Sequence, residues 1–263
     1  MARALLAILL LALLPLASQG IVIRHDKADS RYRVDDSRYP QVFYLHTSFS
    51  HKVCVATLVA PHWAITAAHC ARETPLGETL AGHENYPVTI ARQDYTVTEL
   101  VLHPRANTGD ELTDVDMALL RLDHDVRFIP PALLNQDSDE NGKVYTLLGW
   151  GYTGIGTQGM QSNDGELRRA ENRVEAAGQW LEFRFDDPRE VNSQALDLEG
   201  VPGLGDSGGP ALQEVGDDLV VVGIAVGELE EGASPEHQGL YGAVQLYERI
   251  SGHLDWIESI ISD

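Results

Sequence analysis

The 263-residue chain has only two cysteines, few basic residues and no long apolar segment after its first twenty residues. It carries 19 Lys and Arg residues against 40 Asp and Glu residues, a formal net charge of −21. Nucleic acids and anionic membrane surfaces repel so acidic a protein, so the composition argues against both as partners. The ten histidines include no HExxH motif or other close metal-ligand spacing, and the sequence therefore predicts no metal site.

The first twenty residues, MARALLAILLLALLPLASQG, differ in kind from the rest. Arg3 is followed by an apolar run from Ala4 to Leu14, then by a proline and small residues, which is the arrangement of a secretory signal peptide. The run is too short for a membrane-spanning helix. We therefore predict a signal peptide at residues 1–20, cleavage after Gly20, and a secreted or periplasmic protein without membrane contact once the signal is removed.

Short runs rich in Val, Ile, Thr, Tyr and Phe dominate the remainder of the chain. They recur at intervals typical of a barrel or sandwich, at residues 53–60, 95–102, 117–122, 144–151, 180–185, 219–227 and 240–247. The proline-containing stretch 126–142 interrupts this pattern near the midpoint, which predicts two all-β halves joined by a linker. One amphipathic helix is expected near the C-terminus, where an apolar stripe is formed by Ile250, Leu254, Ile257 and either Ile260 or Ile261.

The two cysteines, Cys54 and Cys70, can pair only with each other. Export would place them in an oxidising compartment, where disulfides form and persist. We expect a disulfide, which would contribute roughly 3 kcal/mol to stability. The alternative is two buried free thiols.

The stretch GLGDSGGPAL, residues 203–212, places Asp206 and Ser207 among glycines. Glycine permits tight backbone turns whose N–H groups can converge on a nearby atom, and a serine held there is a candidate nucleophile. The alternative is an ordinary polar surface turn, because Gly, Asp, Ser and Pro dominate turns in general.

Three motifs in chain order carry a resemblance to a known family: TAAHC at 66–70, DMALLRL at 116–122 and GDSGGP at 205–210. They resemble the catalytic motifs of trypsin-like serine proteases, and the order His, Asp, Ser is the one that the chymotrypsin fold uses. The resemblance implies an all-β fold of two six-stranded antiparallel β-barrels with a C-terminal helix. Residues 21–137 would form the N-terminal barrel with its linker, and residues 138–263 the C-terminal barrel and closing helix.

The resemblance assigns catalytic roles to His69, Asp116 and Ser207, with no cofactor. A serine hydroxyl is a poor nucleophile near neutral pH, so Ser207 needs a base within hydrogen-bond reach. The base in turn needs a carboxylate that fixes its tautomer and stabilises its charged form. Asp114 would face the same side of an extended segment as Asp116, so spacing alone leaves both open.

The same motifs predict an oxyanion hole and an activation pair. The N–H groups of Gly205 and Ser207 would stabilise the negative oxygen of the transition state. In the family, the aspartate of GDSGG pairs with a new N-terminal ammonium, which here would join Asp206 to Ile21. The predicted signal cleavage falls directly before Ile21, so export itself would generate the active form. The alternative is a disordered lead-in, because the glycines that commonly follow Ile-Val are absent.

The specificity pocket is predicted from Val201, which stands where relatives that cut after Arg or Lys carry an aspartate. The expected open walls are Gly227 and Gly239, and Val226 is a further expected substrate-binding residue. An uncharged floor cannot neutralise a buried cation, which favours cleavage after apolar residues. A basic preference stays open because of three acidic residues near the pocket mouth, Glu228, Glu230 and Glu231.

These observations together predict an exported serine endopeptidase that acts as a monomer on protein or peptide substrates. One alternative is a protease-like binding protein that has lost catalysis, although none of the three catalytic residues is substituted. Another is an esterase with the same triad. Gly203 occupies a position where the family usually has a cysteine, and a single disulfide fits a bacterial exported member.

Overall fold

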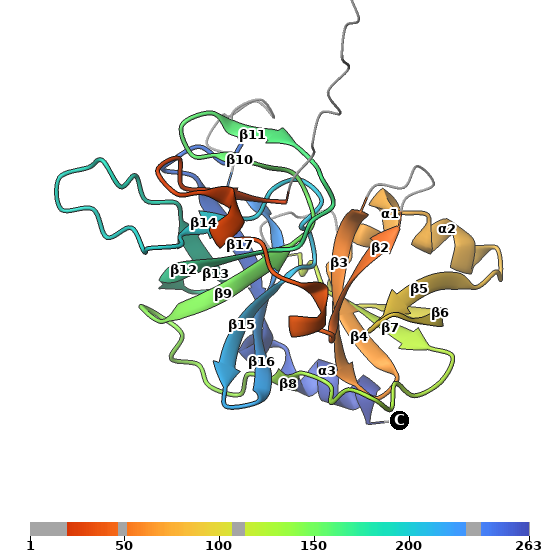
Figure 1. Cartoon of the computed structure of the whole chain (residues 1–263). Coiled ribbons are helices and arrows are strands. Elements are labelled where there is room, and N and C mark those ends of the chain that lie inside the picture. The colour runs from red at the N-terminus through yellow and green to blue at the C-terminus, as the bar shows by residue number, and fades with distance from the viewer. Residues whose placement is uncertain (1–19, 47–51, 107–113, 230–237, 263) are drawn as a thin grey trace, which may run out of the picture.

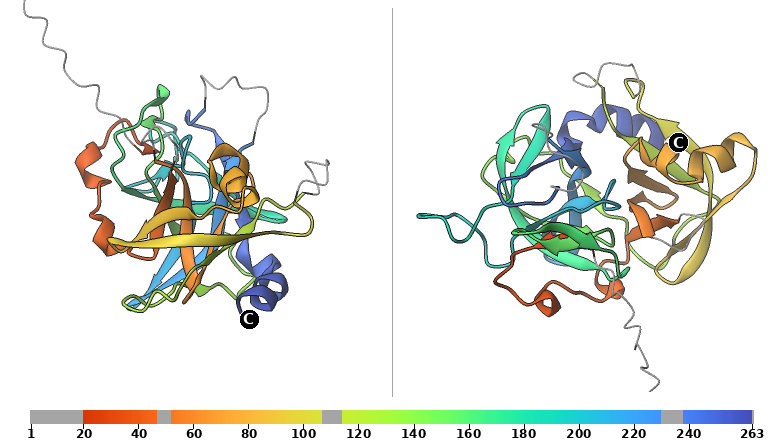
Figure 2. Two further views of the ribbon diagram at one scale, coloured as in Figure 1. Left: turned by 90° about the vertical axis from the view of Figure 1, so that its right-hand side faces the viewer. Right: turned by 90° about the horizontal axis from the view of Figure 1, so that it is seen from above.

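The computed structural model describes residues 20–46, 52–106, 114–229 and 238–262. The predicted signal peptide therefore lies almost entirely outside the described residues, as do Glu230 and Glu231. Two curved β-sheets stand side by side, and a short C-terminal helix lies along the side where they meet (Figures 1 and 2). The prediction of an all-β protein with two barrels and a closing helix is confirmed.

The first barrel is a six-stranded antiparallel sheet in the order β2-β3-β4-β7-β6-β5. Its strands are β2 (Val42–His46), β3 (Lys52–Ala60), β4 (Trp63–Thr66), β5 (Tyr86–Ile90), β6 (Gln93–Leu102) and β7 (Ala118–Leu122). Burial alternates along β5, as expected of a strand with one face toward a core. That core is aliphatic and aromatic, and Leu45, Leu58, Ile90 and Leu120 are fully buried in it.

The second barrel has the strand order β15-β9-β12-β13-β17-β16, and β15 pairs with β16 to close the ring. Its strands are β9 (Val144–Gly149), β12 (Arg168–Ala177), β13 (Trp180–Arg184), β15 (Pro210–Val215), β16 (Asp218–Glu228) and β17 (Val244–Arg249). The short β8 (Leu133–Leu134), from the expected linker, adds to β16 in parallel. Leu147, Leu181, Phe183 and Tyr247 form the core of this half.

A small third sheet ties the start of the described chain to the second half. Its order is β11-β10-β1-β14, with β1 (Ile21–Ile23), β10 (Thr153–Ile155), β11 (Gly159–Ser162) and β14 (Gly200–Val201). The chain from β1 then crosses to β2 in the first half (Figure 1). Residues 21–23 therefore lie with the second half in space, and the boundary at residues 137 and 138 stays a prediction.

The helices are short. They are α1 (Cys70–Glu73), α2 (Leu76–Ala81) and α3 (Leu254–Ile261), with 3-10 turns at Asp29–Arg31, Asp36–Arg38 and Ile250–Gly252. The predicted stripe of α3 is confirmed, because Ile257 is fully buried and Leu254, Ile260 and Ile261 pack against the same cluster. That cluster joins residues of both barrels, such as Ile65 and Ile224. Among the described residues, no helix is long and apolar enough to cross a membrane.

Candidate active site

His69 and Asp116 meet because β4 and β7 are paired. Thr66, at the end of β4, lies opposite Ala118, the first residue of β7. His69 follows the first of these by three residues and Asp116 precedes the second by two. The His69 backbone N–H donates to Asp116 Oδ1 at 2.8 Å, and His69 Nδ1 is hydrogen-bonded to Asp116 Oδ2. Both carboxylate oxygens therefore hold one residue, which favours Asp116 over Asp114 as the partner of His69.

The disulfide between Cys54 and Cys70 is present, with the two Cα atoms 5.9 Å apart. It joins β3 to the start of α1, directly beside His69. Both cysteine sulfur atoms lie close to a ring nitrogen of His69, a grouping that could suggest metal ligation. Because the disulfide engages both sulfurs, this group does not offer the thiolates that such a site needs.

A second carboxylate, Glu73, acts on His69 from the opposite side of the ring. Its Oε2 lies 3.8 Å from His69 Nε2, one turn along α1. Burial alone would lower the pKa of His69, but the hydrogen bond to Asp116 and the negative charges of Asp116 and Glu73 outweigh it, so the pKa is raised. Sequence reasoning missed Glu73, although its spacing from His69 on a helical turn was a usable signal.

The loop that carries Ser207 is held by the buried carboxylate of Asp206. Asp206 is fully buried and accepts N–H bonds from Gly151 at 2.6 Å, Gly203 at 2.8 Å and Ile21 at 3.3 Å. Burial raises the pKa of Asp206 to about 6. The structure thus brings Ile21 and Asp206 together; here Ile21 follows Gly20 in the chain, so its nitrogen is a neutral peptide N–H.

Ser207 is fixed against the first barrel by its backbone. Its carbonyl oxygen accepts the N–H of Val55, on β3, at 2.7 Å. The following residue, Gly208, has φ +74°, and a Cβ there would lie 2.3 Å from the Val55 carbonyl oxygen. Only glycine fits this close approach between the barrels.

Two N–H groups of the loop, those of Gly205 and Ser207, have no hydrogen-bond acceptor among the described residues. The N–H groups of Asp206, Gly208 and Gly209 donate to backbone carbonyls, but among the described residues no acceptor is bonded to those of Gly205 and Ser207. Gly205 has φ +92°, a backbone conformation that favours glycine. The two predicted oxyanion-hole donors are therefore free for an external acceptor.

His69 and Ser207 line one cavity of about 300 Å³. Its other described lining residues are Glu73, Met160, Pro202, Gly203, Leu204, Gly205, Ala225, Val226, Gly227, Glu228, Gln238 and Gln245. Val226 and Gly227, both predicted to bind substrate, are among them.

Val201 and Gly239, also predicted for the pocket, are not among those lining residues. Val201 is fully buried beside Phe185 and pairs with Val22 across β1 and β14. A Cβ at Gly239 would lie 2.7 Å from Val22. Both positions pack against Val22 of β1, and their roles in substrate binding stay predictions.

Glu228, which the sequence analysis placed near the pocket mouth, lines the cavity together with Gln245, which it did not predict. They are cross-strand neighbours on β16 and β17, so their side chains share one face of the sheet. Glu228 Oε2 accepts an N–H bond from Gln245 Nε2 at 2.7 Å and another from the Gly239 backbone at 2.9 Å. A carboxylate is thereby held in the cavity that also contains Ser207.

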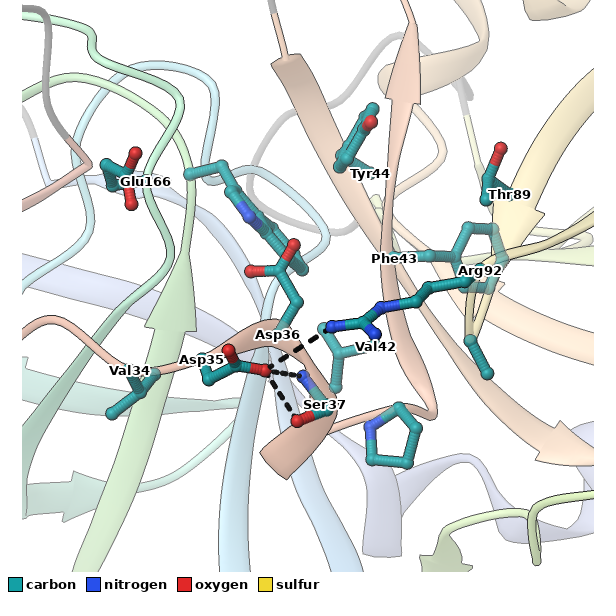
Figure 3. Close-up of a pocket in the computed structure, with 13 residues that line it drawn as sticks. Val34, Asp35, Asp36, Ser37, Val42, Phe43, Tyr44, Thr89, Arg92 and Glu166 are labelled. Atoms are coloured by element: carbon teal, nitrogen blue, oxygen red, sulfur yellow. Dashed lines mark hydrogen bonds and ion pairs between the residues drawn. The ribbon is translucent and has the colours of Figure 1, made fainter.

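A larger cavity of about 540 Å³ lies elsewhere, beside β2 and the turn between β5 and β6 (Figure 3). Asp35 there accepts the Ser37 N–H at 2.9 Å and lies 3.9 Å from the Arg92 guanidinium. The described residues that line this cavity include neither histidine nor cysteine. The smaller cavity is the one that contains both the candidate base, His69, and the candidate nucleophile, Ser207.

Compared with known protein families, the chain matches the family Trypsin over residues 30–257. The chain belongs to the trypsin family. Among its relatives, a CLIP domain-containing serine protease B15 of Anopheles gambiae is 27% identical over 238 residues, covering 79% of this chain and 61% of the relative. Melanization protease 1 of Drosophila melanogaster is 28% identical over 238 residues, covering 78% of this chain and 57% of the relative.

The alignments thus cover only about three fifths of the length of these two relatives. Both are insect proteins, so the comparison gives no support to the expectation of a bacterial member of the trypsin family.

Proposed function

We propose that the protein is an exported serine endopeptidase. Ser207 Oγ attacks the carbonyl carbon of the scissile peptide bond and transfers its proton to His69 Nε2. The protonated His69 then gives that proton to the leaving amine, and the acyl group stays on Ser207. A water molecule, deprotonated by His69, then attacks the acyl carbon, and the carboxylic acid is released as Ser207 regains its proton. The observation that carries this proposal is that His69, bound to Asp116, and Ser207 line the same cavity.

Asp116 has two tasks in this mechanism. Its hydrogen bond fixes the tautomer of His69 with the proton on Nδ1, so that Nε2 can accept a proton from Ser207. Its negative charge also stabilises the imidazolium that forms during attack. The raised pKa of His69 is in keeping with this second task.

The oxyanion is stabilised by the N–H groups of Gly205 and Ser207. Charge develops on the substrate carbonyl oxygen only during the reaction, so donors already in place need no reorganisation at that moment. Loss of one such donor typically costs about 3 kcal/mol of transition-state stabilisation.

The preference at the cleavage position rests on Glu228. Glu228 is among the described residues that line the cavity with Ser207, whereas Val201 is not. Gln238 adds a buried side-chain oxygen that has no hydrogen-bond partner among the described residues. Lysine and arginine carry the N–H donors and the charge that such a lining favours, which supports the basic alternative over the apolar one.

A peptide-library profile tests this preference. We expect cleavage after Lys or Arg in the wild-type protein and a loss of that bias in Glu228→Gln, while cleavage dominated by apolar residues in the wild type would restore the role expected of Val201.

Activation is proposed to follow cleavage between Gly20 and Ile21. The Ile21 nitrogen already lies 3.3 Å from the Asp206 carboxylate, and cleavage would convert this neutral donor into an ammonium. The resulting ion pair would hold the loop that carries Ser207. N-terminal sequencing of the exported protein, together with a variant that keeps one residue before Ile21, tests this step: full activity of the extended variant would contradict it.

Hydrolysis of matched peptide-amide and ester substrates separates the proposed function from its alternatives. We expect the wild-type protein to hydrolyse both and Ser207→Ala to hydrolyse neither. A protease-like binding protein would leave both substrates intact, and an esterase would turn over only the ester.

A further inference from the structure

A buried glutamate on the second barrel, Glu248, contacts the backbone of Asp116 on the first. Glu248 is 1% exposed and lies on β17, whereas Asp116 lies two residues before the start of β7 in the other barrel. Glu248 Oε1 accepts the Asp116 N–H at 2.8 Å and the Trp180 indole N–H at 3.3 Å. The contact therefore crosses the interface between the two halves.

The hydrogen bond from the Asp116 N–H to Glu248 is well suited to fix the position of Asp116. A charged acceptor gives a stronger and shorter hydrogen bond than a neutral one. The donor is the main chain of Asp116, so the bond locates the whole residue and leaves both side-chain oxygens to His69. A buried main-chain N–H that loses its acceptor is also costly, which makes displacement of Asp116 unfavourable.

The second carboxylate oxygen of Glu248 faces a histidine. Glu248 Oε2 has no hydrogen-bond partner among the described residues but lies 3.5 Å from His253 Nε2. His253 packs edge-on against His103, which packs in turn on Trp256 of α3. Glu248 therefore also lies beside the aromatic side chains that pack at the start of α3.

We propose that Glu248 is a positioning residue for the catalytic pair. The active site divides between the barrels, since His69 and Asp116 belong to the first and Ser207 to the second. The Glu248–Asp116 bond sets where the acid–base pair stands relative to the barrel that carries Ser207. This inference rests on the proposed function, but it assigns Glu248 no contact with substrate.

Fluorophosphonate inactivation of the full mature protein tests the role without knowledge of the substrate. It separates the maximal inactivation rate, which reports the chemistry, from the probe's binding constant. Glu248→Leu removes the acceptor, and we expect the maximal rate to fall on the order of tenfold to a hundredfold with unchanged probe binding. Glu248→Gln keeps an acceptor oxygen and should recover most of the rate.

Glu140→Gln is the matched control, because Glu140 is also a fully buried glutamate of the second half but bonds Arg249 and Ser251 instead. We expect it to leave the maximal rate unchanged. If Glu248→Leu does not fold, Glu248→Asp replaces it: the shorter side chain keeps the charge but withdraws from the Asp116 N–H. The maximal inactivation rate of Glu248→Gln should then exceed that of Glu248→Asp.

Either of two rate measurements would overturn the proposal. One is a Glu248→Leu variant that reacts as fast as the wild type; the other is a Glu248→Gln variant that reacts as slowly as Glu248→Leu or more slowly than Glu248→Asp. The proton resonance of His69 Nδ1 provides a readout that needs no activity. The resonance should shift in Glu248→Leu, or in Glu248→Asp where that variant replaces it. It should stay in place in Glu248→Gln and in Glu140→Gln. A wild-type protein that fails to react with the probe would refute the proposed function, whereas an unmoved resonance would refute the role of Glu248.

Discussion

The two barrels hold their parts of the candidate active site by different means. In the first barrel, strand pairing between β4 and β7 and the Cys54–Cys70 disulfide bring His69 to Asp116. In the second, Ser207 sits on a loop whose anchor is the single buried carboxylate of Asp206. The first arrangement follows from backbone pairing and one covalent bond. The second depends on one buried carboxyl group, on its protonation and on the N–H groups that donate to it.

This difference teaches which perturbations should reach which half. A change in pH, or a substitution or extension at Ile21, should act mainly on the loop that carries Ser207. Changes in the disulfide or in Asp116 should act on the acid–base pair. The bonds that cross the interface, from Val55 to the Ser207 carbonyl and from Asp116 to Glu248, couple the two halves.

The largest effect is expected at Asp116. Asp116→Asn should lower kcat by about ten-thousandfold, because the amide no longer holds the correct tautomer of His69. Burial and packing are little changed, so thermal unfolding should resemble that of the wild type. Steady-state kinetics on a peptide amide give the rate; a drop of only a few fold would show that another acid, such as Asp114, supports His69.

Loss of the disulfide should weaken the first half. Replacing both Cys54 and Cys70 by alanine should lower the free energy of unfolding by roughly 3 kcal/mol, because the unfolded chain regains the freedom that the cross-link removes. Urea denaturation followed by Trp fluorescence measures this. An unchanged free energy of unfolding would mean that packing alone holds α1 against β3.

The second half should respond to pH through Asp206. Burial raises the pKa of Asp206 from 3.8 to about 6, so the folded chain binds this proton more tightly than the unfolded chain. The contribution of Asp206 to the unfolding free energy is therefore greatest below about pH 4 and declines as pH rises toward 6. A free Ile21 ammonium would favour the carboxylate and flatten this decline.

The measurement compares protein that begins at Ile21 with a variant that keeps one extra residue, in urea titrations across this pH range. Other carboxylates cancel in the difference between the two. The extended variant should lose more stability between pH 4 and 6, and parallel profiles would show that the terminal charge does not reach Asp206.

The smallest effect is expected at Glu73, whose side chain is 58% exposed. Glu73→Gln removes a negative charge near His69 and should lower the pKa of His69. Because the neutral form of His69 is the base, the rise of kcat/KM with pH should then occur at lower pH. Glu78→Gln, on the exposed side of α2, is the control and should leave the profile in place.

The fold and the pairing of His69 with Asp116 could be predicted because both leave signals in short stretches of the sequence. Runs rich in β-branched and aromatic residues predicted β3, β6, β7, β9, β13, β16 and β17, and the three motifs made His69, Asp116 and Ser207 the catalytic candidates. Strand β12 was missed because RRAENRVEAA is mostly polar. Its inward-facing side chains include Arg168, which is fully buried only because Asp29 and Asp164 pair with it from distant or neighbouring loops.

The pocket was less predictable for a related reason. Which side chain faces a cavity depends on the register between β16 and β17, and one sequence does not give that register. Glu228 was noted only as an acid near the mouth, and Gln245 was not noted at all. Glu248 likewise contacts Asp116 across 132 residues of sequence and across the interface between the barrels.

The central claim is that the two halves assemble one nucleophile and its base at Ser207 and His69. Its most direct test is reaction of the mature protein with a fluorophosphonate, followed by proteolytic digestion and mass spectrometry of the modified peptide. The account predicts one adduct, on Ser207, that is absent in Ser207→Ala and strongly slowed in His69→Ala. An unmodified protein, or an adduct on another serine that survives in Ser207→Ala, would contradict it.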